Sequence, residues 1–210
     1  MTKPYKLYAA KGGGSMVVEL AFAHAKVPVE IVDIDWKDVG WESKVLKNIN
    51  PLGQVPTLIL PDGSIVTESA AIVLHLSERV PQANLAPLAN ERERAQFLRW
   101  LMFLVSAVYP TFTYGDDPKR WLGGDKEVGK KLRAATDDHR KMLWTFVESQ
   151  ITGPWFLGEK WSALDLYVWT MSHWRPGLAW LKSDCPKLHE IAGTVAGQAR
   201  TKEVASRNGL

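Results

Sequence analysis

The stretch from Asn50 to Ile72 constrains the fold of this chain more than any other. Val55-Pro56 stands at the head of an apolar, strand-like run, and a strand tolerates proline at its first residue. Asp62-Gly63 is a strong signal for a tight hairpin turn. Glu68-Ser69 follows at the start of a helical pattern, where unpaired backbone N–H groups favour an acid and a hydroxyl. The stretch therefore predicts a hairpin that begins at a proline and leads into a helix.

Strand and helix patterns alternate along the first part of the chain. Residues from Lys6 to Tyr8 and from Val29 to Ile34 have the apolar and β-branched character of strands, and Met16 to Ala25 between them has helical character. The predicted hairpin adds strands at Thr57 to Leu60 and at Ser64 to Val66. The resulting order, βαβ followed by ββα, resembles the thioredoxin fold.

The strand signals stop after Val80-Pro81. Prolines and asparagines from Gln82 to Asn90 are typical of a short linker. Beyond it, apolar residues recur at helical spacing, as at Phe97, Leu101, Leu104 and Val108. We expect an α/β thioredoxin-like domain over residues 1–80, a linker over 81–90 and an all-α helical domain over 91–210.

A helix start is predicted near Ser162. The hydroxyl of Ser162 and the carboxylate of Asp165 have the spacing of a capping box, and Trp161 and Leu166 have that of a hydrophobic staple. The role of this motif is in folding. From cap energetics alone, Asp165→Ala is expected to cost about 1 kcal/mol of stability.

Composition and charge exclude several classes of protein. The net charge is +3, from 26 basic and 23 acidic residues spread along the chain, without the basic stripe of a nucleic-acid-binding protein. The single cysteine, Cys185, leaves no internal disulfide and no Cys-x-x-Cys motif, which fits a reducing compartment and a cytoplasmic location. The apolar run from Trp100 to Pro110 is shorter than the roughly 20 residues that span a bilayer, so we expect no membrane segment. The histidines and acids lack metal-ligand spacing, so we expect no metal.

Val55-Pro56 is the first candidate for ligand binding. A cis bond before proline at a strand entry turns the N–H and C=O of the preceding residue outward, where they pair with the peptide groups of a ligand. Gln54 lies next to this dipeptide. The alternative is that Pro56 only starts a strand.

Glu68 and Ser69 are the second candidate. A helix N-terminus attracts a carboxylate, to which Ser69 donates a hydrogen bond, while Glu68 holds an ammonium group. The alternative is that Thr67 caps the helix and Glu68 only complements its dipole. The two interpretations do not exclude each other.

Ser15, after the glycines of Gly12-Gly13-Gly14, is the third candidate. A thiol near pKa 8.5 is mostly protonated at neutral pH, and a hydroxyl donor at a helix N-terminus favours its thiolate. One charge-assisted hydrogen bond of roughly 2 kcal/mol lowers such a pKa by one to two units. The alternative is that Ser15 is an ordinary N-cap.

With these motifs in place, the whole chain resembles a cytosolic glutathione transferase, nearest to bacterial beta-like and unclassified members. Two segments carry the resemblance, Asn50 to Ile72 and Gly158 to Asp165. It implies glutathione as co-substrate, held by Gln54, Val55, Pro56, Glu68 and Ser69, with Ser15 stabilising its thiolate. It also implies a homodimer.

The transferase classes differ in the residue that activates the thiol. Beta-type members have a cysteine before the serine of the first loop, and here that position holds Gly14. Tyrosine-type members have a tyrosine at the end of the first strand, and Tyr8 occupies that place. Tyr8 is therefore the alternative to Ser15 as the catalytic residue, unless it is only an aromatic residue that packs within the strand.

In the second region, the resemblance places Tyr109 and Trp174 in the pocket of the electrophilic co-substrate. Met102 stands where beta-type members have an asparagine. Both aromatic residues also suit an ordinary core.

The function implied is conjugation of the glutathione thiolate to a small apolar electrophile, as in detoxification. One alternative is a glutathione-binding carrier of apolar ligands with little turnover, which Gly14 and Met102 favour. The other is a glutathione-dependent reductase or isomerase on the same fold.

Overall fold

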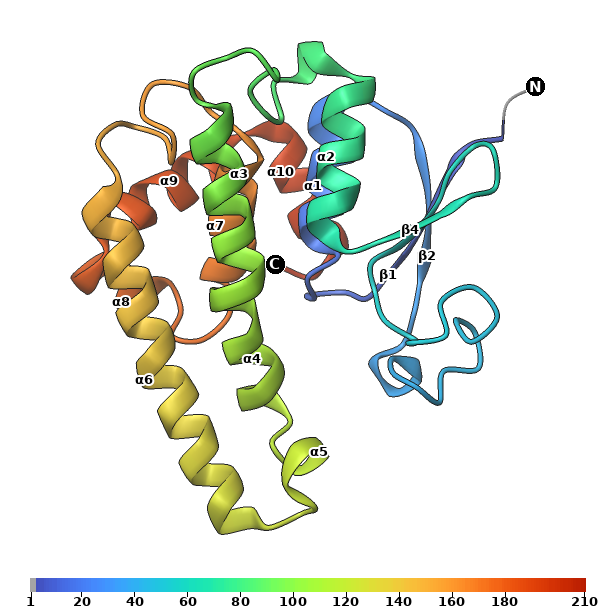
Figure 1. Cartoon of the computed structure of the whole chain (residues 1–210), viewed down its shortest axis with the longest axis vertical. Helices are drawn as coiled ribbons and strands as arrows, with labels where there is room; N and C mark the ends of the chain where they lie inside the picture. Colours follow the sequence, from blue (N-terminus) through green and yellow to red (C-terminus); the bar gives the residue numbers. More distant parts are fainter. Residues whose placement is uncertain (1–2) are drawn as a thin grey trace. The chain divides into compact units, whose positions relative to one another are not determined.

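A mixed four-stranded sheet forms the centre of the N-terminal part of the computed structural model, which describes residues 3–210 (Figure 1). Its strands are β1 (Tyr5–Ala9), β2 (Val29–Asp33), β3 (Thr57–Ile59) and β4 (Ile65–Thr67), in the spatial order β2-β1-β3-β4. Strand β1 is parallel to β2 and antiparallel to β3, and β3 is antiparallel to β4. This topology confirms the predicted βαβ and ββα units.

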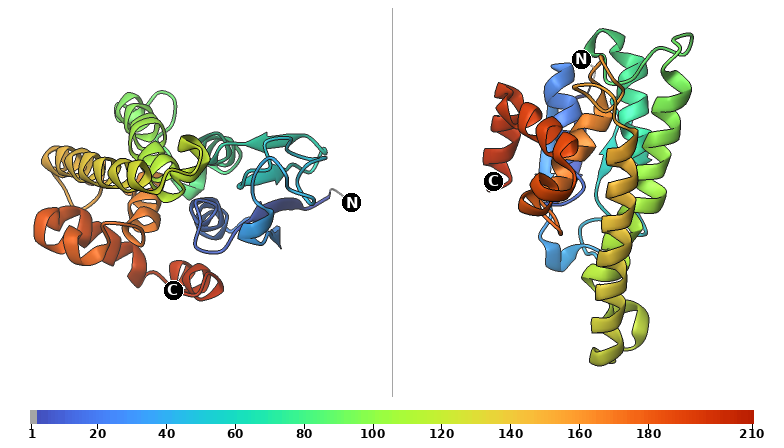
Figure 2. Two further views of the ribbon diagram at one scale, coloured as in Figure 1. Left: turned by 90° about the horizontal axis from the view of Figure 1, so that it is seen from below. Right: turned by 90° about the vertical axis from the view of Figure 1, so that its left-hand side faces the viewer.

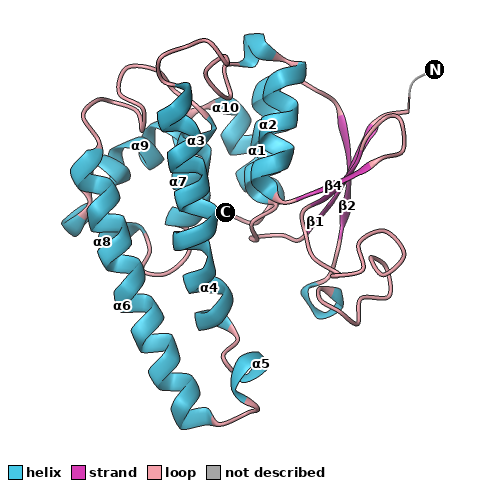
Figure 3. Ribbon diagram, viewed as in Figure 1, coloured by secondary structure: helices cyan, strands magenta, loops and turns pink. Residues whose placement is uncertain are grey.

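Helices α1 (Met16–Ala25) and α2 (Ser69–Arg79) pack on one face of this sheet (Figure 3). The ring of Tyr5 in β1 contacts Phe22 of α1 and His75 of α2, with ring centroids 5.2 and 6.5 Å apart. Successive side chains of a strand point to opposite faces, so Leu7 and Ala9, which are fully buried, face the helices together with Tyr5.

The connection between β2 and β3 is largely irregular (Figure 3). It contains one short 3-10 helix, η1 (Trp36–Asp38). The carboxylate of Asp38 accepts hydrogen bonds from the backbone N–H groups of Lys44 and Val45, at 2.8 and 3.2 Å. These hydrogen bonds hold the backbone of the connection in one conformation, although most of it is not helical.

The second region is helical, as predicted. Its first long helix runs through α3 (Arg94–Phe103), a π-helical turn η3 (Leu104–Val108) and α4 (Tyr109–Asp116). Pro110 has no N–H to donate within this helix, and the wider π turn lies directly before it. Beside α4 runs α6 (Lys126–Gln150), reached through α5 (Lys119–Leu122) (Figure 2).

Helix α7 (Ala163–Ser172) is buried along its whole length. The predicted capping box is present at its start, because Ser162 and Asp165 each bond the other's backbone N–H. The carboxylate of Asp165 also accepts the N–H of Phe156 at 2.8 Å. The box therefore closes the turn before α7 as well as capping the helix.

The last helices are α8 (Leu178–Asp184), α9 (Pro186–Gly197) and α10 (Ala199–Arg207). By its contacts the chain forms two compact units, one of residues up to Leu88 together with Thr194–Leu210, the other of Ala89–Gly193. The predicted helical domain extends from residue 91 to residue 210, whereas the second unit ends at Gly193. Residues 194–210 group with the first unit because α10 packs against α1.

Candidate functional site

Three of the predicted site segments meet at one end of the sheet. The register pairs Tyr8 of β1 with Thr57 of β3, and Thr57 with Thr67 of β4. Because β3 is antiparallel to both neighbours, the C-terminal ends of β1 and β4 and the N-terminal end of β3 lie at the same end of the sheet. The loop before α1, the Val55-Pro56 dipeptide and Glu68-Ser69 follow or precede these strand ends directly. The structure therefore brings the predicted glutathione-binding residues together with the first loop.

The segment before β3 is held by its own side chains. The backbone C=O of Gln54 accepts hydrogen bonds from Asn50 Nδ2 at 3.1 Å and from Thr57 Oγ1 at 2.8 Å. The peptide bond between Val55 and Pro56 is cis, as predicted. Among the described residues, the N–H and C=O of Val55 find no hydrogen-bond partner. The geometry therefore suits pairing with a ligand's peptide groups. The side chain of Gln54 is exposed.

Glu68 occupies the N-cap position of α2 in an uncommon backbone conformation, with φ 64° and ψ 114°. A positive φ costs a residue other than glycine of order 1–3 kcal/mol and is often found at ligand sites. The carboxylate of Glu68 is exposed and forms no ion pair with any described residue. Thr67 ends β4 and does not cap α2, so the alternative that it does so is wrong. Ser69, the first residue of α2, is half-buried.

Ser15 stands at the N-cap position of α1, but its hydroxyl does not bond the helix. The Oγ accepts the N–H of Ala10 at 3.0 Å and donates to the C=O of Ala10 at 3.1 Å. The side chain is fully buried. The hydroxyl thus ties the end of β1 to the start of α1, and its part in activating a thiol stays a prediction.

Sequence reasoning missed the contact between Trp36 and the first loop. The indole Nε1 of Trp36 donates to the C=O of Lys11 at 2.9 Å, and its ring lies over Gly13. A Cβ added at Gly13 would lie 2.6 Å from the Trp36 ring. The run of glycines was the available signal, because it marks a place where another group approaches the backbone closely.

Tyr8 is half-buried and points to the sheet face opposite α1 and α2. This follows from the alternation of β1, in which Tyr5, Leu7 and Ala9 face the helices. Lys6, on the same face as Tyr8, pairs with Glu30 at 3.0 Å. The catalytic role of Tyr8 also stays a prediction.

In the second unit, the two predicted pocket residues lie together. The rings of Tyr109 and Trp174 meet edge to face at 5.6 Å, and Phe112 contacts both, at 6.3 and 5.0 Å. We call these three residues the aromatic cluster. Tyr109 and Trp174 are each half-buried.

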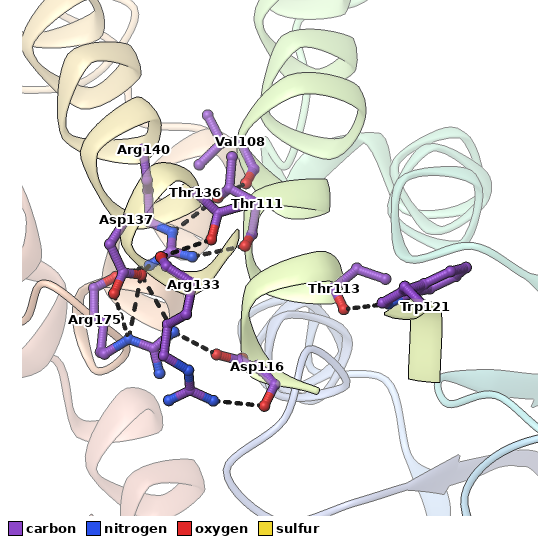
Figure 4. Close-up of polar contacts among 10 residues, drawn as sticks. All are labelled: Val108, Thr111, Thr113, Asp116, Trp121, Arg133, Thr136, Asp137, Arg140 and Arg175. Atoms are coloured by element: carbon purple, nitrogen blue, oxygen red, sulfur yellow. Dashed lines mark hydrogen bonds and ion pairs between the residues drawn. The ribbon is translucent and has the colours of Figure 1, made fainter. Parts of the chain in front are cut away.

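A buried arginine, Arg140, packs against the aromatic cluster. Figure 4 shows its polar contacts. The guanidinium of Arg140, on α6, lies 3.7 Å from the centroid of the Phe112 ring. It donates to the hydroxyl and the C=O of Thr111, each at 2.8 Å, and to Asp137 at 2.7 Å. Arg140 is fully buried, and its donors find acceptors on α4, on α6 and at the C=O of Arg175. The sequence contains little indication that Arg140 is buried, since a charged residue in a helix rich in charged residues is usually exposed to solvent.

Asp137 joins Arg140 to Arg175 (Figure 4). Burial alone would raise the pKa of the Asp137 carboxyl, but the hydrogen bonds and charges of Arg175 and Arg140 outweigh it and hold this pKa below its usual value. Arg175 also pairs with Asp116 at the end of α4, at 2.8 Å. The network fixes α4, α6 and the segment after α7 around the aromatic cluster.

Neither a metal centre nor a membrane span emerges from residues 3–210. They contain no group of three or more histidine, cysteine or acidic side chains placed to hold a metal ion. None of their helices is long and apolar enough to cross a bilayer.

Comparison with known proteins places residues 3–78 in the family described as glutathione S-transferase, N-terminal domain. Along 97% of this chain and 98% of its own length, an uncharacterised GST-like protein, YncG of Escherichia coli, is 38% identical. The glutathione S-transferase GstA, also of Escherichia coli, is 25% identical over 95% of this chain and 94% of its own length.

Solved structures show the same similarity over the whole chain. A glutathione transferase homologue from Sulfitobacter, solved with bound glutathione, is 26% identical and superposes with a TM-score of 0.86, covering 100% of both chains. BphK, a bacterial GST solved as a ternary complex, is 25% identical with a TM-score of 0.81, covering 98% of this chain and 100% of its own.

Proposed function

The chain belongs to the glutathione S-transferase family, and we propose that it conjugates the thiolate of glutathione to a small apolar electrophile. The observation that carries the proposal is the convergence of Val55-Pro56, Glu68-Ser69 and the loop before α1 at one end of the sheet. Glutathione has a peptide backbone, a charged γ-glutamyl end and a thiol, and each of these segments suits one of those parts.

The peptide of glutathione would pair with the N–H and C=O of Val55, as an added strand pairs with a sheet edge. Glu68 would hold the ammonium of the γ-glutamyl group, and Ser69 with the N-terminus of α2 would hold its carboxylate. Glu68 lacks an ion-pair partner among the described residues, and its carboxylate is exposed, which supports a role toward a ligand.

The thiolate would lie at the N-terminus of α1, where the helix dipole favours an anion. Each unit by which the thiol pKa falls corresponds to about 1.4 kcal/mol of preference for the anion. The donor is Ser15, once it gives up its bond to the C=O of Ala10, or the backbone N–H groups of the same loop. The thiolate then attacks the electrophile, a bond forms from sulfur to carbon, and the leaving group departs with its electron pair.

The aromatic cluster is the proposed contact surface for the electrophile, since flat apolar substrates stack well on aromatic rings and Tyr109 and Trp174 are only half-buried. The family context further suggests a homodimer, a cytoplasmic location and a role in detoxification, which are part of the same proposal.

Steady-state conjugation of glutathione to a chlorinated nitroaromatic compound tests the proposal. We expect turnover by the wild type, and a loss of about tenfold or more in kcat/KM for Ser15→Ala if its hydroxyl is the donor. Tyr8→Phe is the matched variant for the rival residue. Absence of turnover over a panel of electrophiles would contradict the proposal.

A second candidate is a glutathione-dependent carrier of apolar ligands. The fully engaged hydroxyl of Ser15 favours it, since a carrier has no need to activate the thiol. A dissociation constant in the submicromolar to micromolar range for glutathione or for an apolar ligand, without turnover of electrophiles, would support this function.

A further inference from the structure

The C-terminal end of the chain is bonded to the loop before α1. Helix α10 packs along α1 within the first unit. At one end of α10, Arg200 donates to the C=O of Ala23 at 2.9 Å, and Thr201 contacts His24 at 3.2 Å. These contacts lie at the C-terminal end of α1. The other end of α10 therefore reaches the N-terminal end of α1, where the proposed thiol site lies.

A buried carboxylate marks this second end. Glu19, in the first turn of α1, has a side chain only 1% exposed. Arg207 donates to both of its oxygens, from Nε and Nη2, each at 2.7 Å. The remaining nitrogen of Arg207 donates to Asp33, at the end of β2, at 2.7 Å. The hydrogen bonds that Arg207 donates to Glu19 and Asp33 raise the pKa of Arg207 further above its usual value, so its side chain is always positively charged.

Asn208 joins this ion pair to the loop. Its Oδ1 accepts the N–H of Gly12 at 3.0 Å, across almost the whole length of the chain. Its Nδ2 donates to Glu19 at 3.1 Å and to the C=O of Val204 at 2.9 Å. The Asn208 amide thus uses its acceptor and both donor hydrogens, with the donors directed at helices α1 and α10.

Gly12 is the residue at which the loop turns, with φ +73°. A loop rich in glycine has many accessible conformations, and a hydrogen bond to a side chain fixed by two helices selects one of them. The same loop supplies the N-terminus of α1, whose N–H groups and dipole would face the thiolate.

We propose that Asn208, held in place by the Arg207–Glu19 ion pair, is a positioning residue that fixes the loop before α1 and thereby lowers the thiol pKa of bound glutathione. The inference rests on the proposed function. The ion pair also matters electrostatically, because an unpaired Glu19 carboxylate in the first turn of α1 would oppose a second anion at that helix end.

The test is an ultraviolet difference titration of the glutathione complex, which reports the thiolate of bound glutathione without requiring turnover. For Asn208→Ala we expect the thiol pKa of bound glutathione to rise by about one unit, which is a tenfold shift in the thiol–thiolate equilibrium. Asn208→Asp keeps an acceptor for the Gly12 N–H but places a negative charge beside Glu19, and is expected to raise the thiol pKa as well. Binding of S-methylglutathione, which has no thiol, should change by less than about twofold.

Thr201→Val is the matched control, since it loses a contact of α10 with α1 at the opposite end from the loop. Its thiol pKa should equal that of the wild type. A rise in Thr201→Val equal to that in Asn208→Ala would assign the effect to helix docking and overturn the positioning role.

An unchanged thiol pKa in both Asn208 variants would also overturn it. Failure of the wild type to bind glutathione would instead overturn the proposed function. In that case, amide hydrogen exchange of the Gly12 N–H tests the contact with Asn208. Faster exchange in Asn208→Ala than in the wild type supports the contact, and equal rates refute it.

Discussion

Asp165→Ala is expected to destabilise the second unit more than an ordinary helix cap would. Asp165 is fully buried, and its two oxygens accept the N–H of Ser162 at 2.7 Å and of Phe156 at 2.8 Å. Removing the carboxylate leaves two buried N–H groups unpaired, at about 1–3 kcal/mol each. Together the two groups give an expected loss of about 2–6 kcal/mol. Cap energetics alone predict a loss of about 1 kcal/mol, and the second hydrogen bond, from the N–H of Phe156, raises the expected loss above that value.

The loss of stability in Asp165→Ala should depend on pH. Burial raises the pKa of Asp165 to about 7, against three backbone hydrogen bonds that lower it. The folded-state pKa lies above the unfolded value of about 3.9, so the folded state binds the proton more tightly. The contribution of Asp165 to stability is therefore full below about pH 4 and declines as pH rises to about 7. Asp165→Ala should cost more at pH 5 than at pH 8.

Urea unfolding of the wild type and Asp165→Ala at these two pH values is the assay. Asp138→Ala is the control, because Asp138 is an exposed aspartate on α6, and it should change stability by less than about 0.5 kcal/mol. A loss below about 1 kcal/mol for Asp165→Ala, or a larger loss at pH 8 than at pH 5, would refute the reasoning.

Three further predictions follow from the site. Arg140→Met should lower the free energy of unfolding by about 3 kcal/mol in a urea titration, because it leaves the buried hydroxyl and C=O of Thr111 without their hydrogen-bond donor. A loss under about 1 kcal/mol would contradict this. Glu68→Gln should raise the KM for glutathione about tenfold with an unchanged melting temperature, since Glu68 has no ion-pair partner among residues 3–210; equal KM values would remove Glu68 from the site. Gly13→Ala should lower the melting temperature by displacing the Trp36 ring, and Trp36→Ala in the same chain should recover part of that loss; additive losses would show that the two residues do not couple.

Local patterns predicted much of the fold. The helix from Met16 to Ala25, the strand beginning at Val29, the hairpin around Asp62-Gly63 and the capping box at Ser162 were all predicted correctly. Each of these elements is indicated by residues close together in the sequence, through a periodic pattern of apolar residues, a turn dipeptide or a helix cap.

Long-range contacts could not be predicted in this way. Arg207 and Asn208 look like solvated residues at a chain end, and only the folded chain brings them to Glu19 and Gly12. The bond of Ser15 to Ala10 is likewise a product of the loop's folded shape, since a serine before a helix is expected to cap it. Arg140 belongs to the same class, because a charged residue of a polar helix is usually exposed.

A crystal structure of the wild-type protein with glutathione tests the central claim most directly. We predict that the peptide of glutathione lies antiparallel to Val55 with hydrogen bonds to its N–H and C=O, its γ-glutamyl group at Glu68 and Ser69, and its sulfur at the N-terminus of α1. Glutathione bound away from Val55, or at Val55 with its sulfur directed away from the loop before α1, would contradict the account.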